Sequence, residues 1–461
     1  MKDLLLSFLV LSILLPIKTL FSQQSVPMSL SLKEAQNYAV ENNLTLKNAR
    51  IDLELAKKRI WETAAAGMPQ VSATANYQHI FVVPEISFPG TVISGTRTSG
   101  TLYGVEVAGD SLFMNNVSSQ PIKLGVQDNL TLDINVTQLI FSGTYLVGLQ
   151  AARIYKQFTD QNLKISERDM RENVANTYYL ILNLEQNAKI LNDSEKNIRK
   201  ILSDMREMLK EGFIENTDVN QLEVTQLNLE NSVKTIERQV NATYGLMKLQ
   251  LGVSLDAEVK LSESLDKMIA SITLESVYDQ PFRLEDNLTY QMLNTQEKLG
   301  EMNVKLGQTN YLPNIAAFYR HSEKAKKADF DFFMKDIAGV SVNIPIFSSG
   351  QRKTIVAERR LELDKMRNSK AQAAEGLKLE FINAENNYQT AYSKYINEKK
   401  NIELSEKIYN KTILKYREGI SSSMDLTNAH NQYLTAQSNY SMAVFSLLSA
   451  KTKIDKLINN L

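Results

Sequence analysis

Few residues of this chain have the types and spacing that catalysis or metal binding would need. The only histidines are His79, His321 and His430, and cysteine is absent. The absence of cysteine excludes disulfides, thiolate metal sites and a cysteine nucleophile. The chain also has no glycine-rich phosphate loop and no zinc-ligand spacing. The sequence therefore predicts no enzyme, no metal site and no cofactor.

The histidines are expected in structural positions. His79 and His321 fall on two predicted strand segments, where we expect them at the strand surface or rim, with a metal or acid–base role as the alternative. His430 is expected on a helix surface.

Two polar side chains have a more informative spacing. Asp425 and Asn428 are three residues apart early in the last helical segment, so they share one helix face. Asp218 stands 425 − 218 = 207 residues earlier. A carboxylate here could serve a function, or it could stabilise the positive end of a helix. Acidic and basic residues number 52 each, and this balance gives no support for nucleic acid binding.

The elements that would position these residues occur twice in the chain. Asn43 and Asn287 begin similar helical segments at a shift of 287 − 43 = 244 residues, and Gly212 and Gly419 end long helical segments at a shift of 419 − 212 = 207 residues. The shorter shift means that a loop in the first half is longer than its counterpart. A fixed internal repeat predicts two halves that share one structural plan.

The repeat sets the predicted boundaries. Residues 1–22 read as a secretory signal peptide, since their apolar run is too short for the alternative of a membrane anchor. The first repeat is expected at 29–251, an equatorial linker region at 252–281, and the second repeat with a C-terminal tail at 282–461.

Four short segments predict β-strands. Residues 130–136 and 340–346 alternate strictly between apolar and polar positions, and weaker segments lie at about 71–81 and 314–321. The two weaker segments are each near the 9–11 residues that a tilted strand needs to cross a bilayer. Four strands cannot close a barrel, and an open sheet in lipid would leave its edges unpaired. If these strands span a membrane, several chains must contribute. A Gly-, Ser- and Thr-rich loop at about 82–123 separates the first two strands.

Most of the remaining chain is expected to be helical. Residues 144–210 and 351–417 contain no proline, and helices of that length would measure on the order of 100 Å. The last helical segment has apolar residues spaced three and four apart, which predicts coiled-coil packing against helices of similar length. These seam residues are Leu426, Ala429, Tyr433, Ala436, Tyr440, Ala443 and Leu447.

The two turns between helices are predicted sites of interaction. Gly212 and Gly419 are expected to close their helices in a left-handed conformation. Phe213 and Ile420 follow at the apex of each turn with no obvious core nearby, which indicates a docking surface. The alternative is a packed turn that only joins its own helices. Capping residues are expected at Asn216-Thr217 and Ser422-Ser423.

In order, spacing and duplication, the chain resembles the TolC-type outer-membrane efflux channels. The resemblance rests on the repeat, on helices that end at Pro69 and Pro313 before a strand, and on the Phe-Ser-Gly strand exits at Phe141 and Phe347. It implies a mainly α fold with a small β part. Each protomer of a homotrimer would give four transmembrane strands to a twelve-stranded barrel and its helices to a coiled-coil tunnel in the periplasm.

The resemblance also implies partners and site residues. A periplasmic adaptor protein would dock at the two turns, an inner-membrane transporter would supply substrate, and outer-membrane lipid would surround the barrel. Asp425, Asn428 and Asp218 match the pore constriction, and Tyr416 matches a tyrosine that holds the closed tip. Better-known members have a second aspartate where this chain has Asn428, and an arginine at the position of Ser421. We therefore expect the tip to be held closed mainly by packing and by Tyr416 hydrogen bonding.

A second class of function stays open at this stage. The alternative is a secreted or periplasmic coiled-coil scaffold without a pore. The alternating strands and the doubled proline–strand junctions favour the channel, because a coiled coil alone needs neither.

Overall fold

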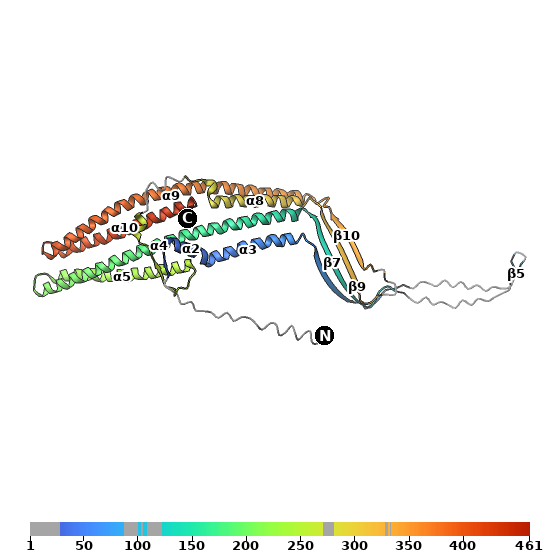
Figure 1. The fold of residues 1–461 in the computed structure, drawn as a ribbon, viewed down its shortest axis with the longest axis horizontal. Helices are drawn as coiled ribbons and strands as arrows, with labels where there is room; N and C mark the ends of the chain where they lie inside the picture. The colour runs from blue at the N-terminus through green and yellow to red at the C-terminus, as the bar shows by residue number, and fades with distance from the viewer. Residues whose placement is uncertain are drawn as a thin grey trace, which may run out of the picture. The chain divides into compact units, whose positions relative to one another are not determined.

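The structure is a computed structural model, shown in Figure 1. The residues that it describes are 28–86, 100–102, 105–107, 122–270, 281–327, 331 and 333–461. The predicted signal peptide, most of the glycine-rich loop and part of the predicted linker lie outside these residues.

Contacts divide the chain into two units. We call Met1–Glu54, Phe158–Asn294 and Asn368–Leu461 the helical unit, and Leu55–Gln157 and Thr295–Arg367 the sheet unit. Each unit contains residues from both sequence repeats. The two structural units therefore do not coincide with the two sequence repeats, and the repeat boundaries stay a prediction.

Long helices form most of the helical unit. They are α4 (Gly143–Lys210), α5 (Asn216–Leu251), α9 (Gln351–Arg417) and α10 (Ser423–Leu457). α4 and α9 have 68 and 67 residues and begin in the sheet unit. Two antiparallel hairpins, α4–α5 and α9–α10, result (Figure 1). The predicted long helices are confirmed.

The coiled-coil seam lies where its spacing predicts. In α10, five of the seven seam residues are buried, and the two tyrosines are half-buried. A core cluster near the turns joins residues of all four helices, among them Ile198, Leu222, Tyr409 and Leu426. Heptad spacing thus packs the two hairpins against each other, because neither could bury this stripe alone.

Short elements surround the helices at the other end of the helical unit. β1 (Met28–Leu30) pairs in parallel with β8 (Val259–Leu261), and α2 (Leu32–Asn42), α6 (Leu265–Ala270) and the 3₁₀ turn η1 (Leu284–Asp286) lie nearby in sequence. The hydroxyl of Tyr178 on α4 donates to the carbonyl of Leu30 at 3.0 Å. These contacts tie the predicted linker region to the helices.

The same asparagine contact occurs once in each repeat. Asn43 precedes α3 (Leu44–Ala65), and Asn287 precedes α8 (Leu288–Thr309). Each side-chain oxygen accepts from amides two and three residues on, which caps the helix. Each side-chain nitrogen donates to a carbonyl at the end of another long helix, Gln250 at 2.8 Å and Leu457 at 3.1 Å.

The sheet unit contains a four-stranded antiparallel sheet. Its strands are β2 (Gln70–His79), β7 (Asp128–Ser142), β9 (Asn314–Lys324) and β10 (Asp336–Asn343), in the order β10-β9-β7-β2. All four predicted strands are confirmed. The fourth ends at Asn343 rather than at residue 346, because the proline at 345 has no amide hydrogen to donate to a neighbouring strand.

The remaining described strands are two short pairs. β3 (Glu85–Ile86) pairs with β6 (Ile122–Lys123), and β4 (Gly100–Leu102) pairs with β5 (Val105–Val107).

The sheet has one apolar and one polar face. Strand register places most exposed apolar residues of the four strands on one face, and Ser72, Asn135 and Arg320, together with the exposed Phe318, on the other. Alternation of this kind is typical of a sheet between lipid and water. The exposed apolar residues of the apolar face are Val71, Tyr77, Leu130, Leu132, Ile134, Tyr319, Val340 and Val342.

His79 and His321 lie in equivalent clusters at strand ends. Nδ1 of His79 lies 2.9 Å from the Asp128 carboxylate, and Nδ1 of His321 lies 2.7 Å from Asp336. The hydroxyl of a tyrosine two residues earlier donates to the same carboxylate in both cases. The described residues contain no group of three or more acidic or histidine ligands suited to a metal ion. The rim position that we predicted for these histidines agrees with the structure.

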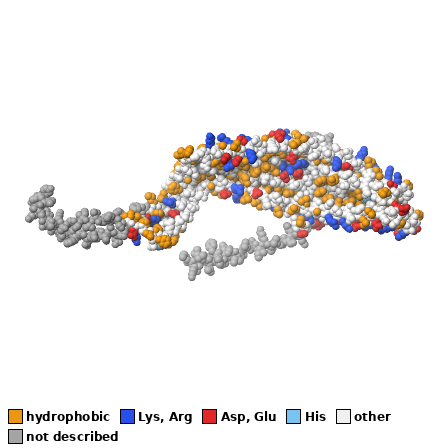
Figure 2. All heavy atoms as spheres, turned by 180° about the vertical axis from the view of Figure 1, so that it is seen from behind, with side chains coloured by type: hydrophobic (Ala, Val, Ile, Leu, Met, Phe, Trp, Pro, Cys, Tyr) orange, Lys and Arg blue, Asp and Glu red, His pale blue; other side chains and the backbone are white. Residues whose placement is uncertain are grey.

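Within the described part of the chain, no helix is both long and apolar enough to span a membrane. Figure 2 shows hydrophobic side chains exposed among charged side chains of both signs.

Candidate pore constriction and docking turns

Both turns of the helical unit close their helices with the same backbone motif. Gly212 and Gly419 have φ angles of 77° and 73°, in the left-handed region that glycine adopts without steric cost. The amides of Phe213 and Ile420 donate to carbonyls five residues earlier at 3.0 and 2.8 Å, which completes a Schellman motif. The predicted left-handed glycines are confirmed.

The apex of each turn exposes an apolar side chain. Phe213 is 75% exposed and Ile420 is 69% exposed. The neighbouring Ile214 instead packs against the core cluster near the turns. Within one chain these two apex residues are therefore not part of a packed turn, and their role in docking stays a prediction.

The two turns differ in how the next helix begins. Ser422 caps α10: its hydroxyl accepts from the amide of Asp425 at 3.1 Å, and the Asp425 carboxylate accepts from the amide of Ser422 at 3.0 Å. This is a capping box. The N-cap of α5 is Glu215, which makes no side-chain capping bond. The predicted cap at Asn216-Thr217 is therefore wrong, because Asn216 is already helical.

Asp425 has a structural contact and is also accessible. One carboxylate oxygen accepts from the hydroxyls of Ser421 and Ser422 at 3.3 and 2.8 Å. These bonds to Ser422 and Ser421 hold the pKa of Asp425 below its usual range, so the group stays ionised. Both Asp425 and Asn428 are exposed. Asp425 therefore stabilises the start of α10, as one of the two interpretations from the sequence holds. Its negative charge is nevertheless accessible at the surface.

Asp218 joins the two turns. Its carboxylate accepts from the hydroxyl of Ser423, the first residue of α10. Tyr416, at the end of α9, is half-buried against the same core cluster. Burial, and then the charge of Asp218, raises the pKa of Tyr416. Among the described residues of one chain, the hydroxyl of Tyr416 has no hydrogen bond. The predicted Tyr416 hydrogen bond therefore stays a prediction for the assembled trimer.

Comparisons with known proteins agree with this architecture. The family described as outer membrane efflux protein matches residues 284–460. The Campylobacter jejuni outer membrane channel CmeC has a TM-score of 0.70 at 14% identity, over 93% of this chain and 85% of its own. The Vibrio cholerae outer membrane protein VceC has a TM-score of 0.68 at 14% identity, over 93% and 95%.

The open state of the Neisseria gonorrhoeae outer membrane channel MtrE gives a TM-score of 0.69 at 13% identity, over 93% of this chain and 88% of its own. The chain has the fold of the TolC-type outer-membrane efflux proteins. No curated protein sequence matches it.

The TolC-type fold confirms the predicted fold class. The matching family is described as outer membrane efflux protein, and CmeC and MtrE are described as outer membrane channels. The alternative from the sequence was a coiled-coil scaffold without a pore. Such a scaffold does not need a sheet with one apolar and one polar face.

A buried polar stripe of α10 was not predicted from the sequence. The expectation that His430 lies on a helix surface is wrong, because its exposed fraction is 0%. Heptad analysis follows apolar positions and therefore overlooks a second stripe of α10. Its spacing of three, four and seven residues was the available signal. The buried members of the stripe are Ser423, Thr427, His430, Gln437 and Ser441.

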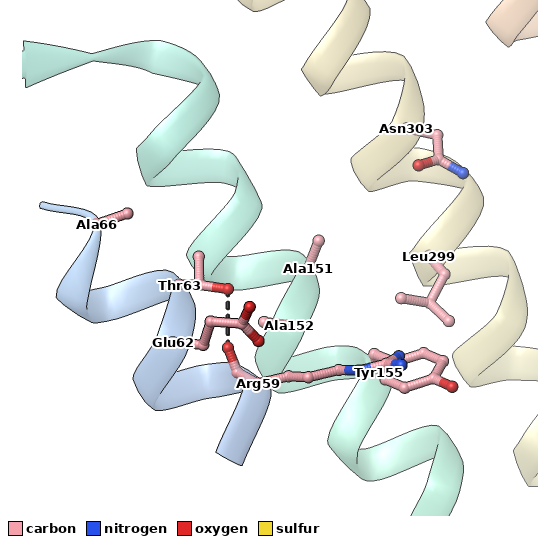
Figure 3. A pocket seen from close by; sticks show the side chains of 9 residues that line it. All are labelled: Arg59, Glu62, Thr63, Ala66, Ala151, Ala152, Tyr155, Leu299 and Asn303. Carbon is pink, nitrogen blue, oxygen red and sulfur yellow. Dashed lines mark hydrogen bonds between the residues drawn. The ribbon is translucent and has the colours of Figure 1, made fainter. Parts of the chain in front are cut away.

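The sheet unit contains a separate open cavity of about 670 Å³ (Figure 3). The Arg59 guanidinium lies over the Tyr155 ring, 5.8 Å from its centroid, and the Thr63 hydroxyl donates to the Arg59 carbonyl at 2.8 Å. The Arg59–Tyr155 contact joins α3 and α4, and the Thr63 bond lies within α3. The lining residues are Arg59, Glu62, Thr63, Ala66, Ala151, Ala152, Tyr155, Leu299 and Asn303.

Proposed function

We propose that this chain forms the trimeric exit channel of a tripartite efflux or type I secretion system in the outer membrane. It would carry substrates from a periplasmic adaptor and an inner-membrane transporter to the exterior. Its helices would extend into the periplasm.

The observation that carries this proposal is the four-stranded sheet. Among the described strands, β2 and β10 each pair along one edge only. In lipid, an unpaired strand edge costs several kcal/mol per polar group. If the apolar face of the sheet contacts lipid, the free edges of β2 and β10 must pair with strands of other copies of the chain. In this arrangement β10 of one copy would pair with β2 of the next. Three copies would supply the twelve strands that the resemblance implies.

At the tip of such a channel, three copies of Asp425 would surround the axis. A ring of carboxylates concentrates negative potential and favours cations. Asn428 adds no charge to this ring, and Asp218 is less exposed than Asp425. We infer that Asp425 is the main selectivity residue of the tip.

Conductance in planar bilayers tests this proposal. We expect wild-type protein to be cation-selective, and Asp425→Asn to lower the cation-to-anion permeability ratio by at least about threefold, because the ring loses its charge. Because hydrogen bonds hold the pKa of Asp425 below its usual range, titration of this carboxyl should not itself alter wild-type selectivity between pH 7.5 and 5.0.

Asp425→Glu is the matched control for that experiment. It keeps the charge, and glutamate suits this position of a capping box. A conducting Asp425→Asn channel with wild-type selectivity would remove Asp425 from the constriction. Protein that is folded and trimeric but never conducts, even after the tip is loosened, would contradict the channel itself.

The exposed apex residues support adaptor docking at the turns. The double change Phe213→Asp and Ile420→Asp should abolish efflux, so that drug tolerance of dependent cells falls to that of cells without the channel. The reason is that a charged side chain cannot enter an apolar contact without a large desolvation cost. Single-channel conductance should be retained. Phe213→Leu with Ile420→Leu is the control. Normal efflux by the aspartate variant would place the adaptor elsewhere.

A further inference from the structure

His430 is buried in a position that offers no partner for a proton. It lies on α10 within the packed end of the helical unit, and it has no exposed surface. Among the described residues, neither of its ring nitrogens has a hydrogen-bond partner. A buried polar atom without a partner destabilises the packed state, and a charged ring would do so more strongly.

Its nearest aromatic neighbours are uncharged. The Tyr409 ring on α9 lies 5.1 Å from the His430 ring between centroids, and the Tyr433 ring stacks on Tyr409 at 5.5 Å. The hydroxyls of Tyr409 and Thr427 are likewise buried without a partner among the described residues. Burial raises the pKa of Tyr409 to about 12, so no tyrosinate forms to balance a charged imidazole.

Burial alone lowers the pKa of His430, and no described carboxylate on the other helices of this cluster contributes to the shift. α4 contributes Ile198, Ile201, Leu202 and Met205, and α5 contributes Val219, Leu222 and Leu229. Two carboxylates at this end of the helical unit bind other groups: Glu195 binds Arg199 at 2.6 Å, and Asp218 accepts from Ser423. Glu406 on α9 acts on Tyr433.

We propose that His430 makes the packing of the α9–α10 hairpin against α4 and α5 sensitive to acid, so that the tip loosens when the surrounding solution acidifies. As a gate, this device rests on the proposed channel function. The acid sensitivity of the packing itself does not require a channel. It rests on the burial of the His430 imidazole and on its lack of hydrogen-bond partners among the described residues.

The direction follows from linkage. Burial lowers the pKa of His430 from 6.5 to about 4, so the packed state binds fewer protons than a loosened state in which the ring is hydrated. The packed state is fully favoured above pH 6.5, and it loses that advantage as the pH falls from 6.5 toward 4. Between pH 7.5 and 5.0 the equilibrium should shift toward the loosened state by up to roughly 30-fold.

Hydrogen–deuterium exchange of the full-length protein tests the proposal without requiring a pore. After correction for intrinsic exchange rates, wild-type peptides from the end of α9 and the start of α10 should open up to roughly 30-fold more often at pH 5.0 than at pH 7.5. His430→Gln and His430→Leu should remove this dependence, because neither side chain titrates. Two variants are used in case one fails to fold.

His79→Gln is the matched control, since it removes an exposed histidine of the sheet unit and should keep the wild-type response. The proposal is overturned if wild-type exchange at the tip is independent of pH. It is also overturned if both His430 variants retain the full response. Conductance measured on the same samples separates the two ideas. Acid-dependent exchange without conductance at any pH would contradict the channel proposal and leave the acid-sensitive packing in place.

Discussion

Gly252→Ala should lower the free energy of unfolding by about 3 kcal/mol, the combined cost of left-handed backbone and of overpacking. Gly252 ends α5 with φ of 72°. A Cβ atom there would lie 2.5 Å from the Asn42 carbonyl oxygen and 3.1 Å from the Asn43 Cα. Backbone atoms cannot rotate away as a side chain can. Chemical denaturation followed by far-ultraviolet circular dichroism measures the change.

Gly212→Ala is the matched control. Its φ is 77°, but a Cβ atom there meets no described atom within 4 Å. It should therefore lose only the conformational term, about 1–2 kcal/mol. Equal losses for the two variants would show that the close approach to Asn42 is unimportant.

The second repeat has a different left-handed residue at the equivalent helix end. Asn459 stands 459 − 252 = 207 residues after Gly252 and has φ of 58°. Its side-chain nitrogen donates to the carbonyl of Asp286, which corresponds to Asn42 at the 244-residue shift. Asparagine tolerates the left-handed region better than most residues. A helix end thus meets the same carbonyl in both repeats, through the backbone of Gly252 in one and through the side chain of Asn459 in the other.

The second large effect is expected for Asn287→Ala, which should lower the free energy of unfolding by about 2–3 kcal/mol. The side chain is almost fully buried and makes three hydrogen bonds, to the amides of Thr289 and Tyr290 and to the carbonyl of Leu457. Alanine would leave these groups without their partner in the core. The same denaturation assay reports the loss.

Asn287→Asp separates the two parts of this contact. It keeps the capping oxygen and removes the nitrogen that binds Leu457. Asn43→Ala tests the equivalent contact, which binds Gln250, and should behave like Asn287→Ala. A loss below about 0.5 kcal/mol in both alanine variants would mean that the repeated asparagine does not hold the helix ends together.

The local elements could be predicted from sequence because their causes are local. Gly212 and Gly419 mark helix ends through their own backbone freedom, and alternating residues mark strands through the pleat of a single segment. The heptad spacing of α10 is likewise a property of one helix. Its buried stripe could be predicted without knowing which helices cover it.

Local signals were less reliable at the ends of elements. The cap of α5 was placed one residue late, since Asn216 is a good capping residue but the chain already turns helical there. The fourth strand was extended past Asn343 because the apolar alternation continues, whereas the hydrogen-bonded pairing does not. Pairing depends on amide donors, and apolar patterns do not report them.

The environment of the candidate site was decided only by tertiary structure. The sequence placed Asp425 and Asn428 on one helix face, and nothing nearby in the chain reveals that Asp218 meets Ser423 across 205 residues. His430 has ordinary helical neighbours, and its burial comes from α4, α5 and α9, which lie elsewhere in the chain. Periodicity determines which face of a helix is apolar. The partner that covers a polar side chain, and thus its charge, depends on how distant helices pack.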